Sequence, residues 1–352
     1  MIVPATKIML APLSALYGMA TRARLALYHQ GAFKVERIEA PVISVGNITA
    51  GGTGKTPLVA WLARAVARQG KRTCILTRGY GRENPKARVL VSDGERVLAD
   101  EREGGDEPLM LALMLRGFAA VVSDANRVEA ARWAIKNLNS EVFILDDGFQ
   151  HLRIARDLNI VTIDAMNPWG GKRLLPRGTL REPLAGLRRA DCLVITRSDQ
   201  SKNLDALRAE ASNLSGGRPV FISRTKLARV RSLFSTTAHQ DQDIHSLTQP
   251  VAAFCAIGNA QAFFQQIKDS GVNTADTRAF PDHHVYTQSE IDRLSAQARA
   301  HGAQALLTTA KDAVKLHSLN FPLPCYVLEV ELTFDEETGL LDQLREAVKS
   351  RG

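Results

Sequence analysis

The sequence of 352 residues lacks the features of several protein classes. It has only four cysteines, and their wide separation argues against a disulfide framework and against the paired spacing of a zinc site. We expect each of them to be a buried thiol in an apolar strand, as is usual in a reducing compartment. These residues are Cys74, Cys192, Cys255 and Cys325.

Long hydrophobic runs are also missing. The apolar stretch at residues 8–20 is shorter than the ~20 residues that a membrane-spanning helix needs. Pro12 and Ser14 interrupt this stretch, which is not typical of a signal peptide. Repeats and low-complexity tracts are absent, which argues against a solenoid.

Negative charge is in deficit, because 45 Lys and Arg residues against 37 Asp and Glu residues give a net charge of +8. The excess predicts anionic partners, such as nucleotide phosphates, a phosphorylated substrate or acidic lipid headgroups. We expect no nucleic-acid partner, because the sequence has neither zinc-finger spacing nor a long basic run. The hydrophobic content of 45% is sufficient for a full core in one large or two ordinary domains.

The first 35 residues contain no acidic residue at all. Lys7, Arg22, Arg24 and Lys34 are interspersed with leucine, methionine and tyrosine. A basic helix with apolar side chains is typical of a segment that lies in the membrane interface. The alternative is a helix packed on the protein's own core. We expect residues 1–35 to form an N-terminal membrane-interface helix.

Residues 49–56, Thr-Ala-Gly-Gly-Thr-Gly-Lys-Thr, are the most informative segment that the sequence does contain. An apolar strand-like run precedes them at 42–46, and a helix-like run follows at 57–63, which is the context of a phosphate-binding loop. Backbone N–H groups there would hold a nucleoside triphosphate, with Lys55 on the β- and γ-phosphates and Thr56 on Mg²⁺. The usual first glycine of the motif is Thr49 here. The predicted nucleotide-binding residues are Gly51, Gly52, Thr53, Gly54, Lys55 and Thr56.

Strands and helices alternate along the rest of the chain, which predicts an α/β fold with a parallel sheet flanked by helices. A second alternating block begins near residue 220, so we divide the chain into the helix at 1–35, a core at 36–225 and a smaller C-terminal α/β domain at 226–352. We expect strands at 42–45, 73–77, 118–122, 142–145, 159–163, 192–196, 251–256, 304–308 and 325–333, a hairpin of 88–91 with 96–98, and helices at 56–69, 107–116, 125–138, 259–269, 287–301 and 335–348.

A second chemical motif follows the strand at 142–145. Asp146 and Asp147 end this strand, at the edge where open parallel sheets bind ligands. Two adjacent carboxylates repel each other, and a divalent cation relieves the repulsion. We therefore expect both to serve a magnesium site. His151 lies shortly after them, either behind that site or on the surface.

Other polar groups follow predicted strands or begin helices. Arg78 and Arg127 come after strands and are candidates for holding anionic groups. Asp106 stands at a helix start, either as a cap or as a site residue. His283 and His284 are adjacent in one loop, and general-base chemistry suits them better than metal binding, because neighbouring loop histidines diverge.

Taken in order, these motifs resemble tetraacyldisaccharide 4′-kinase, the lipid A kinase of Gram-negative bacteria. The segments that carry the resemblance are 51–57, 77–82, 105–108, 123–127, 146–151, 181–183 and 280–284, together with the basic, apolar N-terminus. The resemblance implies transfer of the ATP γ-phosphate to the 4′-hydroxyl of a tetraacylated glucosamine disaccharide 1-phosphate. It also implies a phosphate-loop NTPase-like core, Mg²⁺ and a peripheral location on the cytoplasmic face of the inner membrane, with no obligate protein partner.

The resemblance also assigns roles to residues. Asp106 and a histidine, His283 or alternatively His284, would activate the sugar hydroxyl, and Lys55 would stabilise the moving phosphoryl group. Asp146, Asp147 and Thr56 would hold the metal. Substrate or nucleotide contacts would come from Arg78, Arg127, His151 and Glu182, with Glu182 on the nucleotide side.

Three other functions would use the same phosphate loop. A GTPase is disfavoured because residues 196–199, Thr-Arg-Ser-Asp, lack the Asn and Lys of a guanine-reading motif. A partition-type ATPase usually has Lys at the position of Ala50. A non-enzymatic nucleotide sensor would leave Asp106 and His283 without a task.

Overall fold

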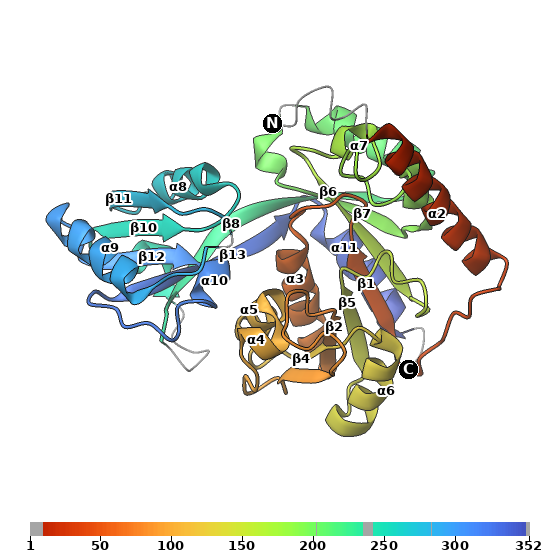
Figure 1. The fold of residues 1–352 in the computed structure, drawn as a ribbon, viewed down its shortest axis with the longest axis horizontal. Helices are drawn as coiled ribbons and strands as arrows, with labels where there is room; N and C mark the ends of the chain where they lie inside the picture. The colour runs from red at the N-terminus through yellow and green to blue at the C-terminus, as the bar shows by residue number, and fades with distance from the viewer. Residues whose placement is uncertain (1–9, 202, 235–241, 283, 350–352) are drawn as a thin grey trace.

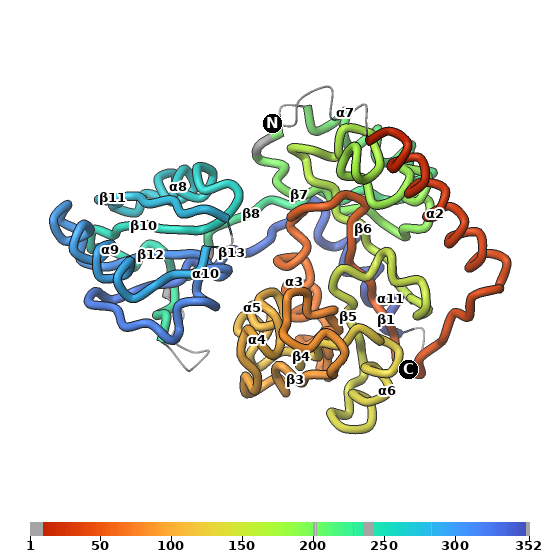
Figure 2. The backbone as a smooth tube through the Cα atoms, viewed as in Figure 1, coloured from red at the N-terminus to blue at the C-terminus, as the bar shows by residue number. Residues whose placement is uncertain are grey.

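The computed structural model describes residues 10–201, 203–234, 242–282 and 284–349. Its fold is mixed α/β and is built on one large sheet, shown as a ribbon in Figure 1 and as a backbone tube in Figure 2. The strands are β1 (Val42–Gly46), β2 (Thr73–Thr77), β3 (Val89–Ser92), β4 (Ala119–Ser123), β5 (Val142–Asp146), β6 (Leu158–Asp164), β7 (Cys192–Thr196), β8 (Val220–Ser232), β9 (Gln242–Asp243), β10 (Val251–Cys255), β11 (Thr274–Ala279), β12 (Ala305–Thr309) and β13 (Cys325–Phe334). The α-helices are α2 (Ala11–His29), α3 (Lys55–Ala67), α4 (Glu101–Gly104), α5 (Asp106–Met114), α6 (Arg127–Leu138), α7 (Leu204–Ser215), α8 (Ala260–Asp269), α9 (Gln288–Ala300), α10 (Ala310–Ala313) and α11 (Glu337–Lys349).

The strands of the first half form a parallel sheet that is buried on both faces. Its order is β7-β6-β1-β5-β2-β4, with β3 added antiparallel at the edge. Every residue of β1, β2, β5 and β6 is buried, as expected for strands that carry helices on both sides. Helices α3, α5 and α11 contribute to the apolar core on one side, and α6 covers the other. The predicted phosphate-loop NTPase-like α/β fold is confirmed.

The central position of β1 decides where the site forms. It lies between β5 and β6, and its residue Val45 is paired with Asp146 of β5. The segment that leaves β1 is the glycine-rich loop, and the segment that leaves β5 begins with the two aspartates. Because the strands are parallel, the two segments emerge at the same edge of the sheet.

The second half continues the same sheet through two long strands. β8 runs parallel to β7 at its start and antiparallel to β13 beyond that, while β11, β10, β12 and β13 run parallel to one another. Figure 1 shows β8 and β13 passing between the two lobes of the molecule. The expected boundary at residues 225 and 226 falls inside β8, so the division into domains stays a prediction.

Helix α2 packs along the flank of the core through small residues. Its buried residues are Ser14 and Gly18, and a Cβ on Gly18 would lie 2.8 Å from Leu174 Cδ1. Leu13, Leu16 and Met19 are exposed on the same helix. An N-terminal helix is therefore present, but the expected amphipathic character is not confirmed, since its large apolar side chains do not form the buried side. In the part of the chain described here, no helix is both long and apolar enough to cross a membrane.

Most expected elements are present within a few residues of their predicted ends. The capping box of Thr287 and Glu290 at the start of α9 is formed as expected. The four cysteines are buried and free. The hairpin after residue 88 is only partly formed, because β3 pairs with β4 and the second arm is reduced to a bridge between Ser92 and Val97. Helix α7 and strands β8 and β11 were not expected.

The contact between the end of β1 and the segment after Asp147 yields a stability prediction. A Cβ on Gly46 would lie 2.5 Å from Phe149 Cβ and 2.6 Å from Phe149 N, and the backbone cannot move aside without moving β1. We expect Gly46→Ala to lower the free energy of unfolding by about 1–3 kcal/mol, measured by chemical denaturation. Gly52→Ala is the control, because nothing lies within 4 Å of its Cβ position. Equal stability of the two variants would contradict the packing described.

Candidate active site

Threonines near the ends of neighbouring strands form hydrogen bonds with the glycine-rich loop. The Thr53 hydroxyl lies 2.8 Å from the Thr162 hydroxyl of β6, and Thr196 of β7 donates to the Thr53 carbonyl at 2.9 Å. Gly54 precedes α3 with a φ of 71°, a left-handed conformation that favours glycine. A glycine-rich loop that leads into a helix N-terminus is the arrangement that suits a phosphate group.

Lys55 and Arg181 both form ion pairs with the Asp147 carboxylate. The Lys55 ammonium lies 3.5 Å from Asp147 Oδ1, and Arg181 donates to both Asp147 oxygens at 2.9 and 2.7 Å. Lys55 also donates to the Asn47 side chain at 3.3 Å. Burial alone would raise the pKa of Asp147, but the two cations outweigh burial and the pKa is lowered. Asp147 is therefore ionised at neutral pH, and it holds Lys55 in place at the loop.

Asp146 differs from its neighbour in having no direct cationic partner. Its side chain is 2% exposed, and Oδ1 has no hydrogen-bond partner. Burial, followed by the negative charge of Glu107, raises its pKa to about 7. A buried carboxylate oxygen without a partner, beside a second carboxylate, is a donor set that suits Mg²⁺. The Asp146 side chain thus fits the predicted metal site, whereas both Asp147 oxygens already accept from Arg181. The described residues contain no group of three or more His, Cys, Asp or Glu side chains placed to hold a metal, and the roles of Asp147 and Thr56 as ligands stay predictions.

The predicted substrate contacts Arg127 and His151 lie close to the aspartate pair. Burial lowers the pKa of Arg127 to about 10, while the charges of Asp146 and Asp147 act to raise it. Burial and the nearby Arg127 lower the pKa of His151 to about 3, so its ring is neutral at physiological pH. Arg78 is exposed and also acts on Arg127. The site is therefore rich in cations around a buried pair of acids.

Glu182 is placed differently from the sequence prediction. It is buried, and its two oxygens accept hydrogen bonds from Gln150 and Arg189 at 2.8 Å. Both oxygens are thus engaged within the protein, and the geometry gives no support to a direct contact with the nucleotide. The arrangement instead fixes the position of the preceding residue, Arg181.

Asp106 stands at the first turn of α5, with its carboxylate facing the second lobe. The Lys315 ammonium lies 3.8 Å from Asp106 Oδ2 and donates to the His284 carbonyl at 3.4 Å. The Lys315 side chain is 9% exposed, whereas that of Asp106 is 43% exposed, so the contact is open to solvent on the Asp106 side. Lys315 thus connects the candidate base on one lobe to the histidine loop of the other.

The structure describes only one of the two histidines that were predicted as the base. His283, the predicted catalytic histidine, lies outside the described residues. The His284 ring stacks on Phe280 with a centroid distance of 5.0 Å, and its Nε2 lies 3.2 Å from both Glu290 oxygens. A ring held in this way has a packing role, which disfavours His284 as the alternative base.

Sequence reasoning missed three residues that the fold brings to the site. Arg181 was part of a recognised segment, but nothing in the sequence pointed to its ion pair with Asp147. Glu107 acts on Asp146 from the first turn of α5, and an acidic helix start has a simpler explanation as dipole compensation. Lys315 had no signal, because its partner is more than two hundred positions away in the chain.

Comparisons with known proteins show the family to which this chain is similar. A family model described as Tetraacyldisaccharide-1-P 4′-kinase, LpxK, matches residues 6–349. The chain is 43% identical to the tetraacyldisaccharide 4′-kinase of Geobacter metallireducens over 308 residues, which is 88% of each protein. It is 38% identical to the protein of that name from Desulfotalea psychrophila over 331 residues, which cover 92% of this chain and 93% of the relative. A crystal structure of LpxK from Aquifex aeolicus in complex with ATP has a TM-score of 0.80 and 32% identity, covering 97% of this chain and 99% of its own.

The contrast between the two aspartates yields a pH prediction. The pKa of Asp146 is raised on folding, so its carboxyl lowers the free energy of unfolding as pH rises from the unfolded pKa toward about 7. We expect Asp146→Asn to raise the melting temperature of the metal-free protein at pH 8, with a smaller effect at pH 5. Asp147→Asn is the matched control and should destabilise, because it breaks two ion pairs. Thermal unfolding in a chelator checks both, and stabilisation by both variants or by neither would contradict the assignment.

Proposed function

The chain belongs to the tetraacyldisaccharide-1-phosphate 4′-kinase family, and on this basis we propose how its residues divide the work of the reaction. The reaction is transfer of the γ-phosphate of ATP to the 4′-hydroxyl of tetraacyldisaccharide 1-phosphate, a step of lipid A biosynthesis. Family membership favours this kinase function over the GTPase, the partition-type ATPase and the nucleotide sensor. The observation that carries the division of roles is the cluster of Lys55, Asp146 and Asp147 beside the glycine-rich loop.

We assign the nucleotide to the loop. Backbone N–H groups of Gly51, Gly52, Thr53 and Gly54 bind the phosphates, and Lys55 neutralises charge that develops on the transferred group. Asp147 aligns the Lys55 ammonium through their contact at 3.5 Å. The unpartnered oxygen of Asp146, together with Asp147 and the Thr56 hydroxyl, holds Mg²⁺. When bound, this ion supplies neutralisation of the phosphate charge.

We assign activation of the sugar hydroxyl to Asp106 and His283. A hydroxyl is a weak nucleophile, and a carboxylate–histidine pair can remove its proton during transfer. Asp106 lies at the start of α5, one residue before Glu107, whose negative charge raises the pKa of Asp146. Lys315 is a positioning residue, because it contacts both Asp106 and the backbone of the histidine loop.

Recognition of the anionic lipid substrate falls to the cations around the aspartate pair. Arg127 and Arg78 offer positive charge beside Asp146 and Asp147. His151 is neutral at physiological pH and can therefore accept or donate a hydrogen bond to the sugar without adding charge. Its Nε2 is buried and has no hydrogen-bond partner among the described residues.

Helix α2 is the proposed contact with the cytoplasmic face of the inner membrane. Leu13, Leu16 and Met19 are three residues apart in succession and are 54%, 60% and 58% exposed, so they share one side of the helix. The opposite side is tied to the active-site edge, since Tyr17 donates to the Arg181 carbonyl at 2.8 Å. An acylated substrate leaves the bilayer at a cost of about 0.8 kcal/mol for each CH₂ group exposed, so the enzyme must approach it there.

The remaining organisation is proposed on the same basis. Residues 36–225 form the kinase core, and residues 226–352 form the smaller domain that supplies the histidine loop and Lys315. The protein acts peripherally and needs neither nucleic acid nor an obligate protein partner.

The first experiment tests the function itself. We expect Lys55→Ala to reduce phosphate transfer by about 10²–10³-fold while the fold survives, because it removes charge stabilisation in the transition state. The measurement supplies labelled ATP, Mg²⁺ and the disaccharide lipid acceptor, and follows label in the lipid. Lys71→Ala, a more exposed lysine that is paired with Glu141, is the control and should retain full activity. A wild-type rate for Lys55→Ala would refute the assignment.

The second experiment tests Lys315 as a positioning residue. We expect Lys315→Met to lower kcat by about tenfold to a hundredfold with little change in KM for ATP, because Asp106 is no longer held toward the histidine loop. Lys315→Arg keeps the charge and should restore part of the rate. A change in KM alone, or equal rates for Met and Arg, would remove this role.

The third experiment tests the membrane contact. We expect the double change Leu16→Glu and Met19→Glu to weaken binding to phospholipid vesicles by at least about tenfold, because each apolar side chain contributes 1.5–3 kcal/mol when buried. Leu98→Glu, which alters an apolar residue that is 50% exposed outside α2, is the control. Vesicle sedimentation measures both, and equal loss of binding by both would show that α2 is not the contact.

A further inference from the structure

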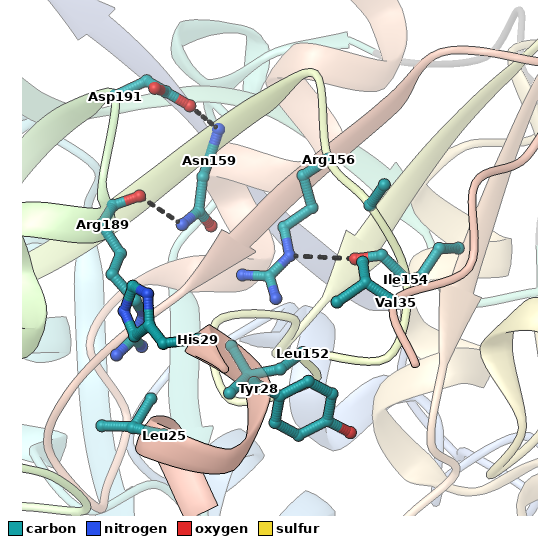
Figure 3. A pocket seen from close by; sticks show the side chains of 11 residues that line it. Leu25, Tyr28, His29, Val35, Leu152, Ile154, Arg156, Asn159, Arg189 and Asp191 are labelled. Carbon is teal, nitrogen blue, oxygen red and sulfur yellow. Dashed lines mark hydrogen bonds between the residues drawn. The ribbon is translucent and has the colours of Figure 1, made fainter. Parts of the chain in front are cut away.

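A cavity lies on the flank of the core, away from the glycine-rich loop. Its volume is ≈ 370 Å³, within the range of small-ligand sites. Helix α2 forms one wall, and the opposite wall comes from the segment before β6 and the segment before β7. Figure 3 shows the side chains that line it, which are Leu25, Tyr28, His29, Val35, Leu152, Ile154, Ala155, Arg156, Asn159, Arg189 and Asp191. Because β6 and β7 begin here, the cavity is at the amino ends of these strands, whereas the active site is at the carboxyl edge.

Arg156 is the central charged group of this cavity. Figure 3 shows its guanidinium pointing into the lined space. It donates to the carbonyls of Ile154, Phe149 and His151 at 3.4, 3.3 and 3.1 Å, so its hydrogen bonds within the protein go to uncharged groups. Burial and the neighbouring Arg189 lower its pKa to about 10, and it stays charged at neutral pH. Three of its five N–H groups are used, which leaves two for an anion.

The wall next to Arg156 offers hydrogen-bond acceptors instead. Asn159 is 5% exposed, its amide N–H donates to the Arg189 carbonyl at 2.9 Å, and its Oδ1 is buried without a partner. Asp191 lines the same wall and accepts from the Asn159 backbone at 2.8 Å. An unpartnered buried amide oxygen costs about 1–3 kcal/mol and calls for a donor. The cavity therefore presents a cation and acceptors side by side, so a zwitterion matches it better than a simple anion.

The position of the cavity relates it to the proposed membrane contact. Leu25, Tyr28 and His29 belong to the last turns of α2, whose earlier turns expose Leu13, Leu16 and Met19. Val35 at the cavity wall is 48% exposed, and Phe33 beside it is 44% exposed. Apolar side chains thus continue from the outer side of α2 to the cavity. If α2 lies in the interface, the cavity is at the depth of the lipid headgroups.

We propose that this cavity binds the phosphoethanolamine headgroup of a membrane lipid. The phosphate pairs with Arg156, the primary ammonium donates to Asn159 and Asp191, and the acyl chains leave past Val35. This proposal rests on the membrane contact of α2 stated above, and it adds lipid selectivity to that contact. An anionic headgroup without a nitrogen donor leaves the Asn159 oxygen unpaired, and a trimethylated ammonium has no N–H to give.

The test uses the full-length protein and vesicles that differ only in the headgroup. Phosphatidylethanolamine is compared with its monomethyl derivative and with phosphatidylcholine, with identical acyl chains and the same fraction of phosphatidylglycerol. We expect binding to weaken by about threefold to tenfold from the primary to the trimethylated amine, because one hydrogen-bonded contact is lost. The comparison needs no variant, so it does not depend on whether a substitution at a buried position folds.

Two variants then locate the selectivity. Asn159→Leu removes the acceptor and Arg156→Gln removes the charge, and each should abolish the preference for the primary amine. Phosphate transfer to detergent-dispersed acceptor should stay within about twofold of wild type, because neither residue is assigned to the reaction. Leu16→Glu with Met19→Glu is the matched control and should weaken binding to all vesicles while keeping the preference.

Free phosphoethanolamine and inorganic phosphate, titrated against the protein by NMR, separate the headgroup from a bare anion. Binding of phosphoethanolamine but not of phosphate supports the proposal. Equal binding of the two would show a site for anions in general and would contradict the proposal. Equal affinity for all vesicles, or a preference that survives both variants, overturns the proposal while leaving the kinase function intact. Loss of phosphate transfer by wild-type protein would overturn the function instead.

Discussion

The structure depends on one electrostatic constraint, the placing of two aspartates side by side at a buried strand end. Asp147 is balanced by Lys55 and Arg181, whereas Asp146 has a buried oxygen with no partner and a raised pKa. Like charges in a medium of low polarity are unfavourable unless a cation joins them. The free protein therefore has a buried carboxylate oxygen beside Asp147 that a divalent cation would satisfy. The threonine contacts beneath the loop and the Glu182 network beneath Arg181 keep this arrangement in place.

The same constraint connects the site to the molecule's outer surface. Arg181, which grips Asp147, gives its carbonyl to Tyr17 of α2, and Glu182 fixes Arg189, which lines the flanking cavity. Helix α2 is thus joined by a hydrogen bond to the residue that pairs with Asp147. A helix that contacts the membrane on one side and the active-site edge on the other can present the core to a substrate that stays in the bilayer. On the far side, Lys315 makes the corresponding connection between Asp106 and the histidine loop.

Much of the core could be predicted because its signals are local. The glycine-rich loop, the strand that ends in two aspartates and the capping box at Thr287 each depend on residues within a few positions of one another. The long strand β8 was missed because it exchanges one neighbour for another along its length, so its burial pattern has no single period. The hairpin after residue 88 was overestimated because β4 competes successfully for the edge of β3. Glu182 was assigned to the nucleotide because its local sequence does not reveal that Gln150 and Arg189 take both its oxygens.

The sequence by itself determined the glycine-rich loop between a strand and a helix, the strand that ends in two aspartates, the parallel α/β class and the family. Each of these features depends on short segments of sequence, in which the residue types alone predict the local structure. Only the tertiary structure decided that Lys55 and Arg181 pair with Asp147 and not with Asp146, that Lys315 contacts Asp106 from the second lobe, and that a charged cavity lies beside α2. The reason is physical: a pKa or an ion pair is set by what surrounds a group in space, and those neighbours come from strands and helices that are far apart in the chain.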